Sequence, residues 1–89
     1  MLIDDVTEAV CTHFKLPLSL VLSDKRSSEL VTARTVMAMV TKRMSRFGMT
    51  ALGRKISRDP TSLSKLAEKG SKKESLLALT DELLGSITS

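Results

Sequence analysis

The 89-residue sequence has few of the residues from which most enzyme sites are built. It contains one histidine, His13, one cysteine, Cys11, and neither tyrosine nor tryptophan. A site with two histidine ligands, or a tyrosine nucleophile for strand transfer, cannot be assembled from this chain alone. The four glycines are scattered, so there is no GxGxxG turn and no Walker-type phosphate loop. These absences argue against an enzyme, and we expect no catalytic residue, bound metal, cofactor or small-molecule substrate.

Other absences narrow the setting of the protein. A lone cysteine provides no disulfide framework and suits a reducing compartment. No apolar run approaches the roughly 20 residues of a membrane span. Leu2-Ile3 followed by Asp4-Asp5 is not a signal peptide. We therefore expect one small soluble cytoplasmic domain with no membrane partner.

Positive charge is concentrated in the middle of the chain. Residues 25–73 hold thirteen of the 14 Lys and Arg against three acids, a net charge of +10, whereas residues 1–24 and 74–89 each carry −3. A basic segment between acidic ends is the footprint expected of a protein that binds a polyanion. The alternatives are a solvated basic surface and a protein-interaction module whose basic face meets an acidic partner.

Apolar residues recur at helical spacing along the chain, and no strand-like alternation competes. The pattern predicts an all-α domain of about six helices, with the first over about Ile3–Phe14 and the longest over about Glu29–Phe47. The expected starts and stops are a capping box at Asp5 and Glu8, Pro17 as the first residue of a short helix, Ser28 as an N-cap and Gly48 as a C-terminal stop.

Two short helices after Gly48 carry the pattern that indicates function. The first covers about Thr50–Ile56, and the second starts at Asp59-Pro60, because Asp is a preferred N-cap and Pro suits the first helical position. Two helices joined by a tight turn, the second opening with small hydroxyl residues, indicate a helix-turn-helix that reads the major groove. Leu63 with Leu66 or Ala67 should face the core, leaving Thr61, Ser62 and Lys65 outward, while Arg54, Lys55 and Arg58 surround the turn where phosphates would pass.

Several segments together resemble the C-terminal DNA-binding domain of the bacterial replication initiator DnaA, over roughly Ile3–Lys69. That family is all-helical and reads duplex DNA with a helix-turn-helix in the major groove and a basic loop in the minor groove. The resemblance implies double-stranded DNA as the partner and the bacterial nucleoid as the location. The segments that carry it are Ile3-Asp4-Asp5-Val6 through Phe14-Lys15, Val21-Leu22-Ser23-Asp24-Lys25-Arg26-Ser27, Ala33-Arg34 through Met37-Ala38-Met39, Leu52-Gly53 and Arg58-Asp59-Pro60-Thr61-Ser62-Leu63.

The resemblance also implies roles for individual residues. Arg26 is expected in the minor groove, and the start of the recognition helix is expected on bases through Asp59, Thr61, Ser62 and Lys65. The expected phosphate-contacting residues are Arg34, Lys42 and Thr50 from the resemblance, with Lys25, Arg54, Lys55 and Arg58 added by the charge pattern.

Two departures from the family pattern lie at the turn. The segment before Arg58 is one residue shorter than in the family and lacks its glycines, and Pro60 stands where a base-contacting histidine is usual. Proline keeps the helix start but removes a readout contact. Related domains occur at the ends of some repeat-associated transposases. A module of that kind fits the departures better than a true initiator does.

The last part of the chain reads differently from residues 1–70, which we assign to the helix-turn-helix domain. In residues 71–89, Ser71 and Glu74 match a capping box, and a leucine-rich helix follows. This helix either packs on the domain core or forms an interaction surface, for self-association or for docking on an N-terminal domain. Binding of single-stranded nucleic acid is disfavoured, because it usually needs exposed aromatics and Phe14 and Phe47 lie on apolar stripes.

Overall fold

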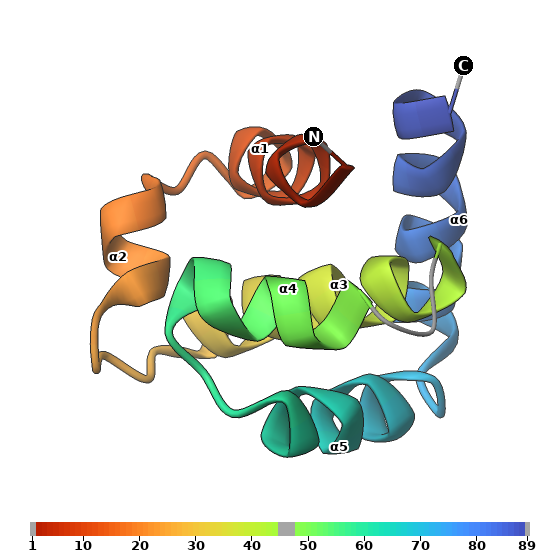
Figure 1. Ribbon diagram of the computed structural model, residues 1–89. Coiled ribbons are helices and arrows are strands. Elements are labelled where there is room, and N and C mark those ends of the chain that lie inside the picture. The colour runs from red at the N-terminus through yellow and green to blue at the C-terminus, as the bar shows by residue number, and fades with distance from the viewer. Residues whose placement is uncertain (1, 45–47, 89) are drawn as a thin grey trace.

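The computed structural model describes residues 2–44 and 48–88, and within them it contains six helices and no strand (Figure 1). The expected all-α domain of about six helices is therefore confirmed. The expected helix end at Phe47 lies outside the described residues. The helices are α1 (Leu2–Phe14), α2 (Leu18–Leu22), α3 (Ser28–Met44), α4 (Gly48–Ile56), α5 (Pro60–Gly70) and α6 (Glu74–Thr88).

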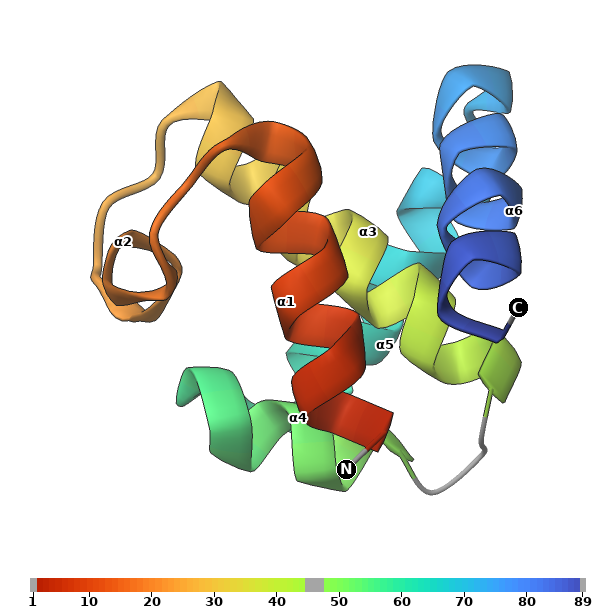
Figure 2. The ribbon, with the colours of Figure 1, turned by 90° about the horizontal axis from the view of Figure 1, so that it is seen from above.

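Helix α3 is the central element, and the other helices pack against it (Figure 2). All of residues 33–41 are buried, as expected for a helix that is surrounded on every side. Met37 and Val40 are fully buried and belong to one apolar cluster with Val6 of α1 and Leu63 of α5. This arrangement fixes α4 and α5 on one side of α3 and α1 on another, so that the position of the helix-turn-helix depends on α3.

The boundaries of α3 and α4 differ from those expected. Ser28 is the first residue of α3, and the Oγ of Ser27 accepts a hydrogen bond from the Leu30 N–H at 3.3 Å. The cap therefore lies one residue earlier, which two adjacent serines make hard to distinguish by pattern. Gly48, expected to follow directly after the longest helix, is the first residue of α4.

Three other expected starts are also shifted. Helix α1 begins at Leu2, so Asp5 lies inside it and cannot act as its cap. Pro17 is extended (φ −70°, ψ 145°) and precedes α2 as its N-cap residue. Ser71 ends α5, and its Oγ donates to the Glu68 carbonyl at 2.7 Å. The Ser71 hydroxyl is therefore bonded to the preceding helix, and α6 begins at Glu74 without the expected capping box.

Helix α6 packs against α1 and α3. Leu83 and Thr80 are buried along it, and an ion pair between Arg43 and Asp81 joins it to α3. Other leucines of α6 are half-buried against the same core. None of the helices in the described residues combines the length and the apolar character that a membrane span requires.

Candidate nucleic-acid interface

Helices α4 and α5 form the helix-turn-helix unit, and the start of α5 agrees with the sequence pattern. Asp59 is the N-cap, its Oδ1 accepting from the Thr61 N–H at 2.9 Å, and Pro60 takes the first helical position. Leu63 is fully buried, whereas Thr61 and Ser62 are exposed. The hydroxyl face therefore points away from the core, as expected of a helix that reads base edges.

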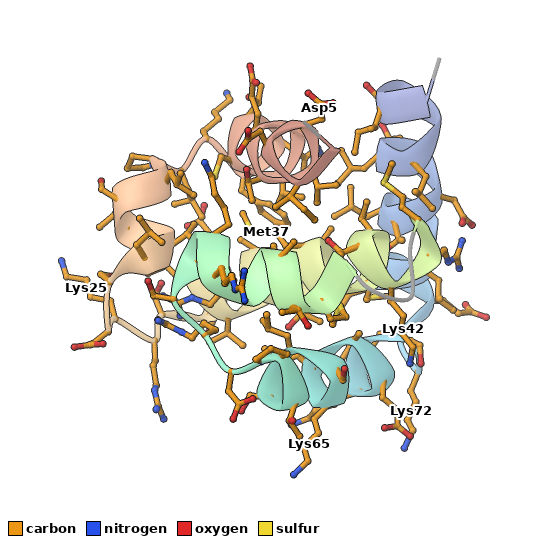
Figure 3. The ribbon with its side chains drawn as sticks, in the orientation of Figure 1. Asp5, Lys25, Met37, Lys42, Lys65 and Lys72 are labelled. Atoms are coloured by element: carbon orange, nitrogen blue, oxygen red, sulfur yellow. The ribbon has the colours of Figure 1, made fainter. Side chains whose placement is uncertain are left out.

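The loop between α2 and α3 presents two exposed cations. Lys25 and Arg26 are exposed, and Figure 3 shows Lys25 extending away from the fold. The loop is ordered by Ser23, whose Oγ donates to the Leu20 carbonyl at 2.5 Å and accepts from the Lys25 N–H at 3.3 Å. Its backbone path is therefore defined right up to the residue before Arg26.

A groove of about 330 Å³ connects this loop with the start of α5. It brings together three residues expected on bases, although they come from two elements more than 30 positions apart in the sequence. All of the charged groups that line it are cationic, so the groove is suited to a polyanion. The residues lining it are Arg26, Val31, Arg34, Arg58, Ser62, Leu63, Lys65 and Leu66.

Arg34, which the resemblance places near phosphates, differs from the exposed cations because it is buried. Its side chain is 5% exposed, and its guanidinium donates to the backbone carbonyls of the loop. Burial, followed by the nearby charges of Arg58 and Arg26, lowers the pKa of Arg34 below its usual value, and Asp24 opposes this shift. The partners are Val21 O (3.0 Å from Nε and 2.8 Å from Nη2), Ser23 O (2.8 Å), Lys25 O (2.9 Å) and Leu20 O (3.4 Å).

The other expected phosphate contacts are more dispersed. Thr50 and Arg54 are exposed on α4, and Lys42 lies near the far end of α5, where it lines a hollow with Glu68 (Figure 3). These residues thus lie outside the groove. Arg58 is half-buried and lines the groove itself.

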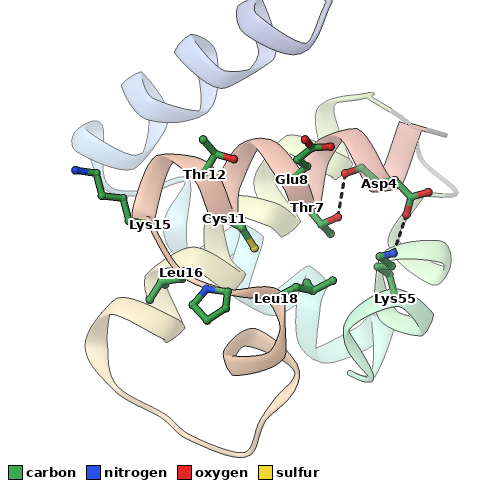
Figure 4. A pocket seen from close by; sticks show the side chains of 10 residues that line it. Asp4, Thr7, Glu8, Cys11, Thr12, Lys15, Leu16, Leu18 and Lys55 are labelled. Atoms are coloured by element: carbon green, nitrogen blue, oxygen red, sulfur yellow. Dashed lines mark hydrogen bonds and ion pairs between the residues drawn. The ribbon is translucent and has the colours of Figure 1, made fainter.

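Lys55 already has an anionic partner within the protein. Its Nζ lies 2.8 Å from Oδ1 of Asp4, at the edge of a hollow between α1, α2 and α4 (Figure 4). The hydrogen bond and the charge of Lys55 lower the pKa of the Asp4 carboxyl. A phosphate would have to compete with this carboxylate for Lys55.

Two residues that support the site were not identified by sequence reasoning. A Cβ built on Gly53 would lie 2.6 Å from the carbonyl oxygen of Arg58, so only glycine lets the turn fold back onto α4. Ser57 adopts a φ of 56°, a left-handed conformation that usually favours glycine. Glycines at this turn are part of the family signature and are the signal for a positive φ, but this sequence has Ser57 in that conformation.

The single cysteine and the single histidine both lie on α1. Cys11 is half-buried, and burial raises the pKa of its thiol, which favours the unreactive protonated form. His13 packs edge-on against Phe14, with ring centroids 5.0 Å apart. Among the described residues, no three His, Cys, Asp or Glu side chains cluster as a metal site would require.

Comparison with known proteins gives a match over most of the chain. The family model described as the bacterial dnaA protein helix-turn-helix matches residues 3–69. The searches of curated proteins and of solved structures found no match. The matched range runs from the first turn of α1 to the last turn of α5 and so includes every residue lining the groove.

Proposed function

Because the chain belongs to the bacterial DnaA helix-turn-helix family, a family of DNA-binding domains, we propose that it binds double-stranded DNA with sequence preference. In this proposal the basic region captures the duplex, and the start of α5 enters the major groove through Thr61, Ser62 and Lys65. Asp59 caps that helix and faces the same bases. Arg26 occupies the adjacent minor groove.

The observation that carries the proposal is the groove between the α2–α3 loop and α5. It places Arg26 beside Ser62 and Lys65, so one duplex can meet both elements at once. A narrow minor groove concentrates negative potential, which favours an inserted arginine at A·T-rich sequence. Lys25, Lys42, Thr50, Arg54, Lys55 and Arg58 are left as candidate phosphate contacts around this centre.

We also infer that the domain acts as a targeting module in a replication-initiator-like or transposase-related protein. Pro60 supports a target different from the usual initiator site, because the proline ring has no polar side-chain atom and cannot supply the contact that the imidazole of the usual histidine makes. The leucine-rich α6, outside the matched range, is then the element available for contact with an N-terminal domain or a second copy.

The test is selection from a random duplex pool at about 150 mM salt, where non-specific electrostatic binding is weakened. We expect an enriched motif of several base pairs with an A·T-rich side. Arg26→Ala should remove the preference for that side, whereas Lys72→Ala, an exposed lysine outside the matched range, should leave the motif unchanged.

The salt dependence of binding separates this proposal from a protein-interaction module. If about five phosphates are neutralised, log K should fall against log salt with a slope of roughly −4 to −5 while the motif persists. Binding that is weak, shows no sequence preference and is lost near physiological salt would favour the interaction module with an acidic partner.

A further inference from the structure

One backbone carbonyl in the α2–α3 loop accepts hydrogen bonds from two arginines on different elements. The Ser23 oxygen receives Nη2 of Arg34, which lies on α3, at 2.8 Å, and also Nη2 of Arg58, which lies in the α4–α5 turn. Two guanidinium groups thus converge on one acceptor. Their like charges repel each other. The backbone carbonyls that accept hydrogen bonds from both guanidinium groups offset this repulsion.

On the side of the turn, Arg58 is fixed at both ends. Its backbone N–H donates to the Gly53 carbonyl at 2.9 Å, and its Nη1 donates to the Ser57 carbonyl at 3.1 Å. Asp59, the next residue, caps α5. A displacement of Arg58 would therefore displace the first turn of the recognition helix.

On the side of the loop, Ser23 is fixed to the segment that carries Arg26. The Ser23 hydroxyl accepts from the Lys25 N–H, and the Lys25 carbonyl accepts from Arg34 at 2.9 Å. Arg26 follows directly, and it is exposed with no ion pair among the described residues. The chain of contacts from α5 to Arg26 is short and consists of hydrogen bonds to backbone.

We propose that Arg58 is a positioning residue that couples the loop bearing Arg26 to the start of α5, so that the minor-groove and major-groove contacts form together. This rests on the proposed function, and it gives Arg58 a different role from a phosphate contact. A phosphate contact would add to binding independently of Arg26. A positioning residue makes the contribution of Arg26 depend on Arg58.

The test is a double-mutant cycle on the duplex selected for the wild-type protein. Arg26→Ala should weaken binding about 10-fold in the wild-type background, as loss of a specific contact does. In an Arg58→Ala background the same change should cost about 2-fold or less, because the loop is no longer aligned. Arg58→Lys should behave like Arg58→Ala in this cycle, since lysine keeps the charge but lacks the planar fork that reaches two carbonyls.

The matched control is Arg54→Ala, an exposed arginine of α4 outside the groove. Its effect should add to that of Arg26→Ala. If the effects of Arg58→Ala and Arg26→Ala also add, and Arg58→Ala lowers the salt slope by about 1, then Arg58 is a phosphate contact and the proposal is wrong.

A second measurement works without DNA and keeps this inference separate from the proposed function. In the free protein, Arg58→Ala should speed hydrogen exchange of the Lys25 amide, whose N–H donates to the Ser23 hydroxyl, by about 10-fold, while the core of α3 stays protected. Unchanged exchange in the loop would overturn the coupling. Failure to select any motif with the wild-type protein would instead overturn sequence-preferring binding and leave this readout intact.

Discussion

The turns that follow α1 and α4 stop their helices in the same way but have different uses. Lys15 and Ser57 each have a φ of 56° directly after their helix. In both turns the next N–H donates to the carbonyl five residues earlier, at 3.0 Å for Leu16 and 2.9 Å for Arg58. This is the hydrogen bond of a Schellman stop, and in both turns a proline follows within two residues.

The residue that donates this bond decides what each turn does. Leu16 is half-buried against the apolar core, so the first turn helps to close the fold. Arg58 instead extends its guanidinium to the Ser23 carbonyl, so the second turn joins the start of α5 to the α2–α3 loop. The lesson is that the same helix stop can pack against the core or bind a distant loop, depending on one side chain.

The largest effect is expected at Arg34, which holds the α2–α3 loop to which Arg58 of the second turn donates. Arg34→Met should lower the free energy of unfolding by about 3 kcal/mol, because several loop carbonyls lose a charged donor inside the fold. Urea denaturation followed by circular dichroism gives this value. Arg54→Met, the same change at an exposed position, should cost less than about 0.5 kcal/mol. Equal losses in the two variants would contradict the role of Arg34.

A smaller loss of stability is expected at the residue whose carbonyl accepts the hydrogen bond that closes each turn. The first turn has Cys11 there, whereas the second requires Gly53. Gly53→Ala should cost about 1–3 kcal/mol, because its Cβ would lie 2.6 Å from the backbone oxygen of Arg58. Gly85→Ala is the matched control on α6, where a Cβ would meet nothing within 4 Å. Thermal denaturation should show that control as neutral or slightly stabilising.

The smallest effect is expected at the two residues with positive φ, and it tests how alike the two turns are. Lys15→Gly and Ser57→Gly should each stabilise the protein by about 0.5 kcal/mol, because glycine removes the strain of a positive φ but also adds freedom to the unfolded chain. Paired denaturation curves measure both. A gain at one turn alone would mean that side-chain contacts, and not the shared backbone, dominate there.

The sequence predicted what local chemistry determines and missed what tertiary contacts determine. The start of α5 was predictable because Asp59 and Pro60 act within their own helix turn. The role of Arg34 was not predictable, because an arginine within a basic segment has the same sequence pattern whether it faces DNA or a ring of carbonyls. Gly53 was overlooked for a similar reason, since its need for a bare Cα arises only when the turn folds back on α4.

The candidate site divides in the same way. Helical spacing correctly separated Leu63 and Ala67, which are buried, from Thr61, Ser62 and Lys65, which are exposed. Sequence alone could not bring Arg26 into the same groove, because that depends on how α3 carries the loop past α5.

The separation of charge along the chain also has a consequence for kinetics. Asp5 lies on α1, on the opposite side of the molecule in Figure 3 from Lys65 on α5, so the molecule has an electric dipole as well as its net charge of +4. A polyanion at a distance exerts a torque that turns the basic side towards it and repels the acidic side. More encounters then begin in a productive orientation, and the association rate should fall as salt screens the field.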